Sequence, residues 1–124
     1  MTEPQEIMKL YTALAASVSI QIPVKGRIDV SNEHGVYIIS NTENIVLHVG
    51  KTDRGVEGIN QRLNNHLGNQ SSFSKKYLKP NNFDLRKGFQ FKYILVSNPR
   101  TRTLVEKLAT GLLCPAHVGT GGKK

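Results

Sequence analysis

The sequence predicts an α/β fold, a small three-stranded antiparallel sheet flanked by helices. Two runs rich in Val and Ile, residues 35–40 and 45–50, lie on either side of the polar turn at residues 41–44. This arrangement is typical of a β-hairpin with a four-residue loop. A third β-prone run at residues 89–97 supplies the remaining strand. Apolar residues recur with helical spacing before, between and after these runs, which predicts the flanking helices.

The hairpin is predicted to carry two different faces. Pairing Ser40 with Ile45 across the turn places Tyr37 opposite His48. Residues opposite each other in an antiparallel pair share a face, with Cβ atoms roughly 4.5–5.5 Å apart. The other face then holds only apolar side chains, namely Val36, Ile38, Leu47 and Val49. We therefore expect one core face and one face with a phenol and an imidazole, an arrangement that a single-residue bulge would disrupt.

A helix is predicted directly after the hairpin, beyond a loop at residues 51–55. Its buried stripe is formed by residues four apart, Ile59, Leu63 and Leu67. Arg62 and His66 are also four apart, so they lie on one side of the helix at the edge of that stripe. The hairpin and this helix can bring Tyr37, His48, Arg62 and His66 into one cluster.

A second helix is predicted from Pro99 to about Leu113. Asn98 is a suitable N-cap, and a proline is tolerated in the first turn. The expected buried stripe is Leu104, Val105, Leu108, Ala109 and Leu112. Glu106 lies beside this stripe, and the simplest interpretation of it is a surface ion pair with Arg102, four residues earlier.

The N-terminal part of the chain reads as an amphipathic helix and an arm. Residues 2–18 begin with capping-box spacing between Thr2 and Gln5. The apolar stripe consists of Ile7, Leu10, Tyr11, Leu14 and Val18. It is expected to pack on the sheet or on a second copy of the chain, which leaves a homodimer open. Residues 19–30, interrupted by Pro23, suit an edge strand or an extended arm.

The charge balance favours a polyanionic partner. The chain has 17 Lys and Arg against 9 Asp and Glu, a net charge of +8, which makes nucleic acid the leading partner class. The alternative is an ordinary solvated basic surface. Five of the positive charges are concentrated in one polar segment, at Lys75, Lys76, Lys79, Arg86 and Lys87.

Aromatic residues interleave with these charges. Phe73, Tyr77 and Phe83 beside lysines suit a phosphate backbone with bases stacked on the rings. The equally available interpretation is that Phe73, Leu78 and Phe83 anchor a loop to the core. Residues 71–78 are expected to form a short helix.

Several classes are disfavoured by the sequence. No apolar run approaches the roughly 18 residues of a membrane span, so no membrane partner is expected. Cys114 is the only cysteine, which excludes an internal disulfide and indicates a reducing, cytoplasmic setting. The segment from Gly50 to Thr52 is not a phosphate-binding loop of the P-loop type, because Ile45 stands where that motif needs glycine.

Taken together, five features resemble the GIY-YIG nuclease family. They are Gly-Val-Tyr at 35–37, His-Val-Gly at 48–50, Arg62 on a helix, Glu106 on a later helix, and Pro115 followed by His117. The family carries a second Tyr where this chain has His48, and often an Asn near the position of His117. The resemblance covers roughly residues 33 to 119. One domain, 1–124, is therefore expected, with an N-terminal helix and arm at 1–32, a nuclease-like core at 33–119 and a flexible basic tail at 120–124.

The resemblance implies a metal-dependent endonuclease acting on nucleic acid. Double-stranded DNA is the expected substrate and partner, and the choice between DNA and RNA is left open by the sequence. It implies that Tyr37 activates or positions water, that Arg62 contacts phosphate, and that Glu106 holds Mg²⁺ or Mn²⁺. His48 or His66 is a candidate to take or relay the proton, because imidazole titrates near neutrality. Lys51 would add positive charge, and His117 would support the site. The alternatives are a non-cleaving nucleic-acid-binding protein that retains the fold and, on charge alone, a basic assembly protein.

Overall fold

A four-stranded antiparallel sheet forms the centre of the molecule. The computed structural model describes residues 1–53 and 55–118. The strands are β1 (Ile20–Gln21), β2 (Gly35–Ser40), β3 (Val46–Lys51) and β4 (Gln90–Leu95), in the order β1-β4-β2-β3. The α/β prediction is confirmed, with one strand more than expected. The additional strand is β1, a short edge strand from the segment that was expected to form an edge strand or an arm.

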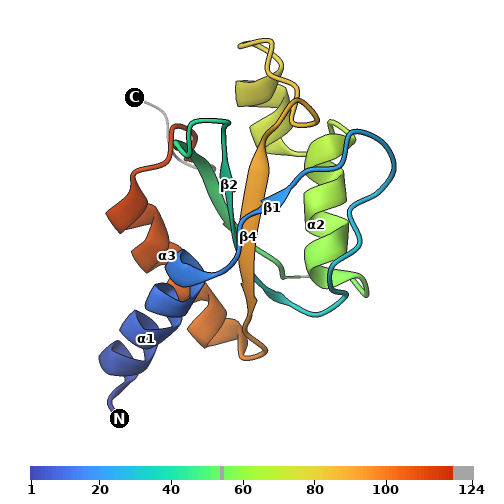
Figure 1. The fold of residues 1–124 in the computed structure, drawn as a ribbon. Coiled ribbons are helices and arrows are strands. Elements are labelled where there is room, and N and C mark those ends of the chain that lie inside the picture. The colour runs from blue at the N-terminus through green and yellow to red at the C-terminus, as the bar shows by residue number, and fades with distance from the viewer. Residues whose placement is uncertain (54, 119–124) are drawn as a thin grey trace.

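The helices cover both faces of the sheet (Figure 1). Helices α1 (Glu3–Ala16) and α3 (Pro99–Leu113) lie on one side, and α2 (Gly58–Leu67) lies on the other. A single π-helical turn, η1 (Ser74–Leu78), replaces the short helix expected at 71–78. The capping box of Thr2 and Gln5 begins α1, and the Asn98 side chain caps α3, both as predicted.

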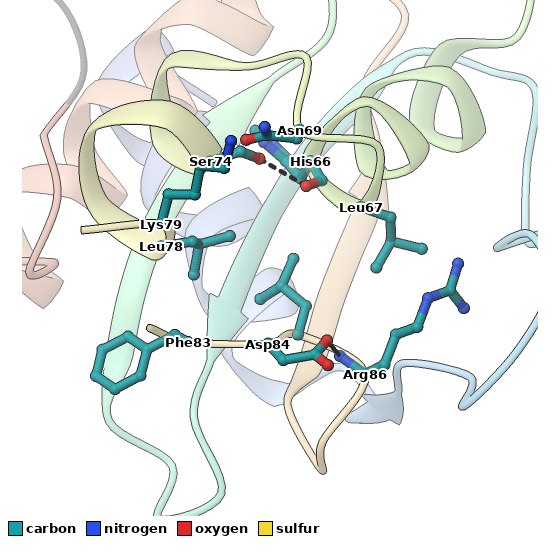
Figure 2. Close-up of a pocket in the computed structure, with 10 residues that line it drawn as sticks. His66, Leu67, Asn69, Ser74, Leu78, Lys79, Phe83, Asp84 and Arg86 are labelled. Atoms are coloured by element: carbon teal, nitrogen blue, oxygen red, sulfur yellow. Dashed lines mark hydrogen bonds between the residues drawn. The ribbon is translucent and has the colours of Figure 1, made fainter. Parts of the chain in front are cut away.

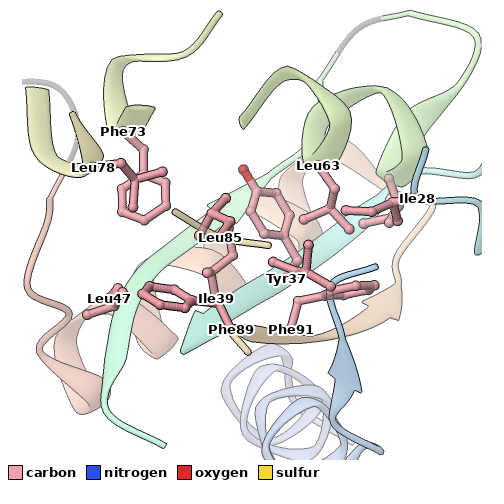
Figure 3. Packing of buried hydrophobic residues seen from close by; sticks show 12 residues of the cluster. Ile28, Tyr37, Ile39, Leu47, Leu63, Phe73, Leu78, Leu85, Phe89 and Phe91 are labelled. Atoms are coloured by element: carbon pink, nitrogen blue, oxygen red, sulfur yellow. The ribbon is translucent and has the colours of Figure 1, made fainter. Parts of the chain in front are cut away.

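Two hydrophobic clusters fill the spaces between the sheet and these helices. The cluster under α2 contains Tyr37, Ile39 and Leu47, which Figure 3 shows packed with Phe73 and Phe91. The cluster under α1 and α3 is formed by Ile7, Leu14, Val36, Ile38, Val49, Val105 and Ala109. Both faces of the hairpin are therefore buried, and the polar face expected from the sequence is covered by α2 and η1.

The predicted hairpin register is wrong by two residues. Tyr37 pairs with Gly50 and Ile39 pairs with His48, while a bulge between Ile39 and Ser40 leaves Leu47 as the extra residue. Between Val36 and Ile39 the observed pairing differs from the predicted pairing by two residues, an even number. Tyr37 and His48 therefore still share a face of the sheet, as diagonal neighbours. Leu47 was predicted on the opposite face and instead joins the Tyr37 cluster.

Two predictions about α3 also need correction. Arg102 is only 3% exposed, and its guanidinium donates to the carbonyls of Val96 and Ser97. The surface pair that is the simplest alternative interpretation of Glu106 therefore does not form, because Arg102 is hydrogen-bonded to the residues that follow β4. Leu112 was expected in the core but is 53% exposed.

The other exceptions concern single side chains and the chain end. Val18 lies beyond the end of α1 and is exposed. Phe73 and Leu78 are buried, so both anchor η1 to the core and the Phe73 ring is not free to stack on a base, while Phe83 is exposed. The basic tail predicted at 120–124 lies outside the described residues.

Candidate active site

A cleft of about 490 Å³ opens where the β2–β3 hairpin meets α2 and α3. Its lining includes six of the residues singled out from the sequence: Tyr37, His48, Lys51, Arg62, Glu106 and His117. They come from β2, β3, α2, α3 and the segment that follows α3. Convergence of side chains from so many elements on one concavity is typical of a site rather than of a solvated surface.

Tyr37 occupies the floor of this cleft because Gly50 makes room for its ring. The two residues are paired across the strands. A Cβ atom at position 50 would lie 2.3 Å from the phenolic oxygen of Tyr37, well inside van der Waals contact. The glycine of the His-Val-Gly triplet is thus required by the tyrosine of the Gly-Val-Tyr triplet.

The Tyr37 hydroxyl has a buried hydrogen-bond partner in His66. Its oxygen lies 2.6 Å from His66 Nε2. Burial raises the pKa of the Tyr37 phenol, and the charge of Arg62 together with a side-chain hydrogen bond from it acts in the opposite direction. The phenol is therefore neutral at physiological pH, and its oxygen lies against an imidazole. Arg62 and His66 were predicted to neighbour one another at the helix edge, and the structure places His66 deeper, behind the tyrosine.

His48 forms a ring cluster beside Tyr37 and His66, whose ring centroids lie 6.0 and 5.1 Å from its own. It stacks on Phe73, with ring centroids 4.5 Å apart and planes 12° from parallel. Its Nδ1 lies 3.3 Å from Nδ1 of His117. Burial lowers the pKa of His48 to about 3, and the nearby charges of His117 and Arg62 act in the same direction. His48 is therefore a neutral aromatic ring at physiological pH.

The segment after α3 holds the His117 side of this pair in place. The backbone N–H groups of Ala116 and His117 donate to the carbonyls of Val46 and Leu47 on β3. Burial and the charge of Lys76 both lower the pKa of His117. With both imidazoles neutral, one of the two Nδ1 atoms donates and the other accepts.

Glu106 is one of the two acidic residues that line the cleft. Burial raises the pKa of its carboxyl, and the charges of Lys51 and Lys107 oppose that shift. Asp53 lines the same cleft and acts on Glu106 as a like charge, while the Lys51 ammonium lies 2.6 Å from one Asp53 oxygen. Among the described residues no three His, Cys, Asp or Glu form a metal-binding group. A single carboxylate nevertheless suits Mg²⁺, which keeps most of its waters when proteins bind it.

The predicted substrate-binding cations lie outside the cleft, apart from Lys51. Lys75, Lys76 and Lys79 are exposed on and beside η1. Lys76 is close enough to the cleft to influence His117. Lys87 is exposed as well. Arg86 instead donates to the carbonyls of Pro23 and Gly26, so it fastens the arm before β2 to the loop before β4.

Sequence reasoning missed several residues around the site. Asp53 could have been noticed, because it follows the Lys51 strand end by two residues. Phe73 was considered for base stacking but lies under His48 instead. Ser71 and Ser74 contact His66 from a segment whose spacing gave no signal.

Comparison with known families identifies the class of protein to which this fold and cleft belong. The family model described as the GIY-YIG catalytic domain matches residues 33–107. The chain belongs to the GIY-YIG catalytic domain family, which implies nuclease activity on nucleic acid. No curated protein matches the chain. Within the described residues, no helix combines the length and the apolar character needed to cross a bilayer.

Proposed function

We propose that the protein is a metal-dependent endonuclease that hydrolyses phosphodiester bonds in double-stranded DNA. The observation that carries the proposal is the meeting of Tyr37, Arg62 and Glu106 in one cleft, with the tyrosine hydroxyl backed by His66. Hydrolysis of a phosphodiester requires an activated water, a cation at the developing negative charge and help for the leaving oxygen. The cleft offers a candidate for each.

Tyr37 is the proposed base. Its oxygen accepts a proton from the attacking water while its own proton passes to His66 Nε2, 2.6 Å away. Of the two histidines considered for this role, His66 is favoured, because its Nε2 contacts the Tyr37 hydroxyl, whereas His48 Nδ1 is engaged with His117. In this proposal the uncharged rings of His48 and His117 pack beside Tyr37 and exclude water from that side of the cleft.

Arg62 and Lys51 are the proposed phosphate contacts inside the cleft. The guanidinium fork can bind two phosphate oxygens at once. Glu106 would hold the divalent ion, Mg²⁺ or Mn²⁺, which stabilises charge on the phosphate and on the leaving oxygen when bound. Asp53, close enough to influence Glu106, adds a second carboxylate to the same region.

The proposal is tested by cleavage of supercoiled plasmid, linear duplex and RNA of the same sequence. We expect nicking of duplex DNA with Mg²⁺ or Mn²⁺ and none with EDTA. Binding to DNA without cleavage under every metal condition would instead support a non-cleaving binder that retains the fold. A cytoplasmic setting and a homodimer that cuts both strands remain predictions, and sedimentation with and without DNA tests the second.

The exposed lysines of η1 are the proposed path of the DNA backbone out of the cleft. Replacing Lys75, Lys76 and Lys79 together with Ala should reduce the slope of log affinity against log salt concentration. Each phosphate contact contributes roughly 0.9 to that slope on B-form DNA, so a decrease of about 2 to 3 is expected. Fluorescence anisotropy across a salt series measures it.

The control for this measurement is the pair Lys9→Ala and Lys25→Ala, since both side chains are exposed and belong to α1 and to the arm. The control protein should keep the slope of the unmodified chain. If the η1 variant also keeps it, the DNA backbone follows a different surface.

A further inference from the structure

His66 is embedded in a hydrogen-bonded network that extends away from the cleft. His66, Ser71 and Ser74 are 2%, 4% and 2% exposed. His66 Nδ1 lies 2.6 Å from Ser71 Oγ, which lies 2.9 Å from Ser74 Oγ. Ser74 Oγ in turn lies 2.6 Å from the backbone carbonyl oxygen of His66, the contact drawn in Figure 2. The network therefore begins and ends on the same residue.

The direction of every hydrogen bond follows from that final carbonyl. A carbonyl oxygen only accepts, so the Ser74 hydroxyl must donate to it. A serine has one hydroxyl proton, so Ser74 has none left for Ser71, and Ser71 must donate to Ser74. The Ser71 proton is then committed too, and its oxygen accepts from His66 Nδ1. Ser71 Oγ also accepts from the backbone N–H of Ser74, at 3.1 Å.

These hydrogen bonds determine which His66 ring nitrogen carries the proton, and so which nitrogen faces the Tyr37 hydroxyl. Burial lowers the pKa of His66, so the ring is neutral and carries one proton. That proton is on Nδ1, which leaves Nε2 as an acceptor pointing at the Tyr37 hydroxyl. The phenol therefore donates to the histidine. With the opposite tautomer, Nε2–H would donate to the Tyr37 oxygen and compete with the attacking water for it.

We propose that Ser71 and Ser74 are positioning residues that hold His66 in the Nδ1–H tautomer, so that Nε2 is free to take the phenolic proton of Tyr37. The catalytic part of this inference rests on the proposed nuclease function. In the step concerned, the water O–H bond breaks as its proton joins the Tyr37 oxygen, and the Tyr37 O–H bond breaks as its proton joins Nε2. No electrons change hands, and His66 becomes an imidazolium.

The network also determines where that proton can go next. The chain from Nδ1 ends at a backbone carbonyl, which cannot carry a proton onward to solvent. The imidazolium is therefore transient, because burial disfavours its charge, and its proton returns through Tyr37 to the cleft. Ser71 and Ser74 thus fix the tautomer without serving as a relay.

The decisive variant is Ser74→Ala, because the Ser74 hydroxyl does not touch the imidazole. Without it, the Ser71 hydroxyl proton loses its acceptor and turns to His66 Nδ1, which favours the Nε2–H tautomer. The backbone N–H at position 74 still donates to Ser71, so the turn that begins η1 is retained. Ser74→Thr keeps the hydroxyl and should restore the original tautomer.

The tautomer is measured directly on ¹⁵N-histidine-labelled protein, from the pyrrole-type or pyridine-type signals of the ring nitrogens. The unmodified protein should show a protonated Nδ1 and an unprotonated Nε2 at His66, and Ser74→Ala should move protonation to Nε2. Cleavage should fall by roughly 10- to 100-fold, by analogy with the loss of the hydrogen-bond partner that orients a metal-ligating imidazole. DNA affinity should not change.

The exposed Ser19→Ala protein is the control and should behave as the unmodified chain in each assay. A protonated Nε2 in the unmodified protein, or an unchanged tautomer in Ser74→Ala, would overturn the inference. If the tautomer moves as expected but neither protein cuts nucleic acid, the positioning of His66 stands and the proposed nuclease function fails. If the tautomer moves and cleavage is unchanged, the catalytic role of the serine pair fails.

Discussion

Replacing Glu106 with Gln is expected to abolish cleavage while leaving DNA binding intact. A neutral amide is a poor ligand for a hard cation that prefers charged oxygen. A bound Lewis acid supplies several kcal/mol of transition-state stabilisation, and a loss of about 4 kcal/mol corresponds to a rate about 10³-fold lower. Affinity should persist or rise, because a negative charge near the phosphate is removed. Plasmid nicking with Mg²⁺ and anisotropy without it measure the two effects on one preparation.

Glu43→Gln is a matched control for this substitution. Glu43 is an exposed carboxylate at the tip of the hairpin, so its neutralisation changes the net charge equally without touching the cleft. The free energy of unfolding should be unaffected by Glu106→Gln, since Arg102 donates to the carbonyls of Val96 and Ser97 and not to Glu106. Full nicking activity in the Glu106→Gln protein would remove the metal assignment and most of the mechanism with it.

Tyr37→Phe should reduce cleavage by roughly 10²- to 10⁴-fold, the usual contribution of a general base. Phenylalanine keeps the ring that packs over Gly50, so the fold is retained. The lost hydroxyl leaves His66 Nε2 without its buried partner, which should lower the free energy of unfolding by about 1–3 kcal/mol. Cleavage rates and chemical denaturation give the two quantities.

The comparison for Tyr37→Phe is Tyr93→Phe. Tyr93 pairs with Tyr37 from the neighbouring strand β4, on the same face of the sheet, but does not line the cleft. The Tyr93→Phe protein also loses a tyrosine hydroxyl from the hydrophobic cluster under α2. It should cleave DNA at the rate of the unmodified protein. Equal activity in the two variants would exclude Tyr37 as the base and leave the cleft without its proposed proton acceptor.

The fold was largely predictable because strong local patterns agree with the tertiary structure. The hairpin, β4 and α3 each combine a clear apolar pattern with a turn or cap signal, and their positions were found within a few residues. The register was not predictable, because no residue pattern in the hairpin marks the bulge between Ile39 and Ser40. Leu47 was misplaced for the same reason.

The candidate site was predictable where one residue determines the place of another. Tyr37 and His48 kept their shared face because the register error was even, and Arg62 reached the cleft because α2 follows the hairpin directly. How deeply each side chain is buried was harder to predict. Helical spacing puts His66 at the edge of a stripe, but only the packing of α2 on β2 shows that it lies behind the tyrosine.

Polar contacts between distant parts of the chain could not be predicted from the sequence. Arg102 looked like a surface residue four positions from an acid, and its burial depends on where β4 ends relative to α3. The roles of Ser71 and Ser74 depend on a π-helical turn, for which the local sequence offers no specific signal. Serines in polar loops are common, so their chemistry emerges only from their neighbours.

The bulge in the hairpin has a practical meaning for protein engineering. It separates the pairing of Tyr37 and His48 with their partners from the pairing nearest the turn, where Ser40 meets Val46. We therefore expect the bulge to absorb changes in the length of the turn before they reach the residues of the cleft. Thr42 and Glu43 are exposed at that tip, which makes it the natural place to splice in an affinity tag or a fluorophore attachment site.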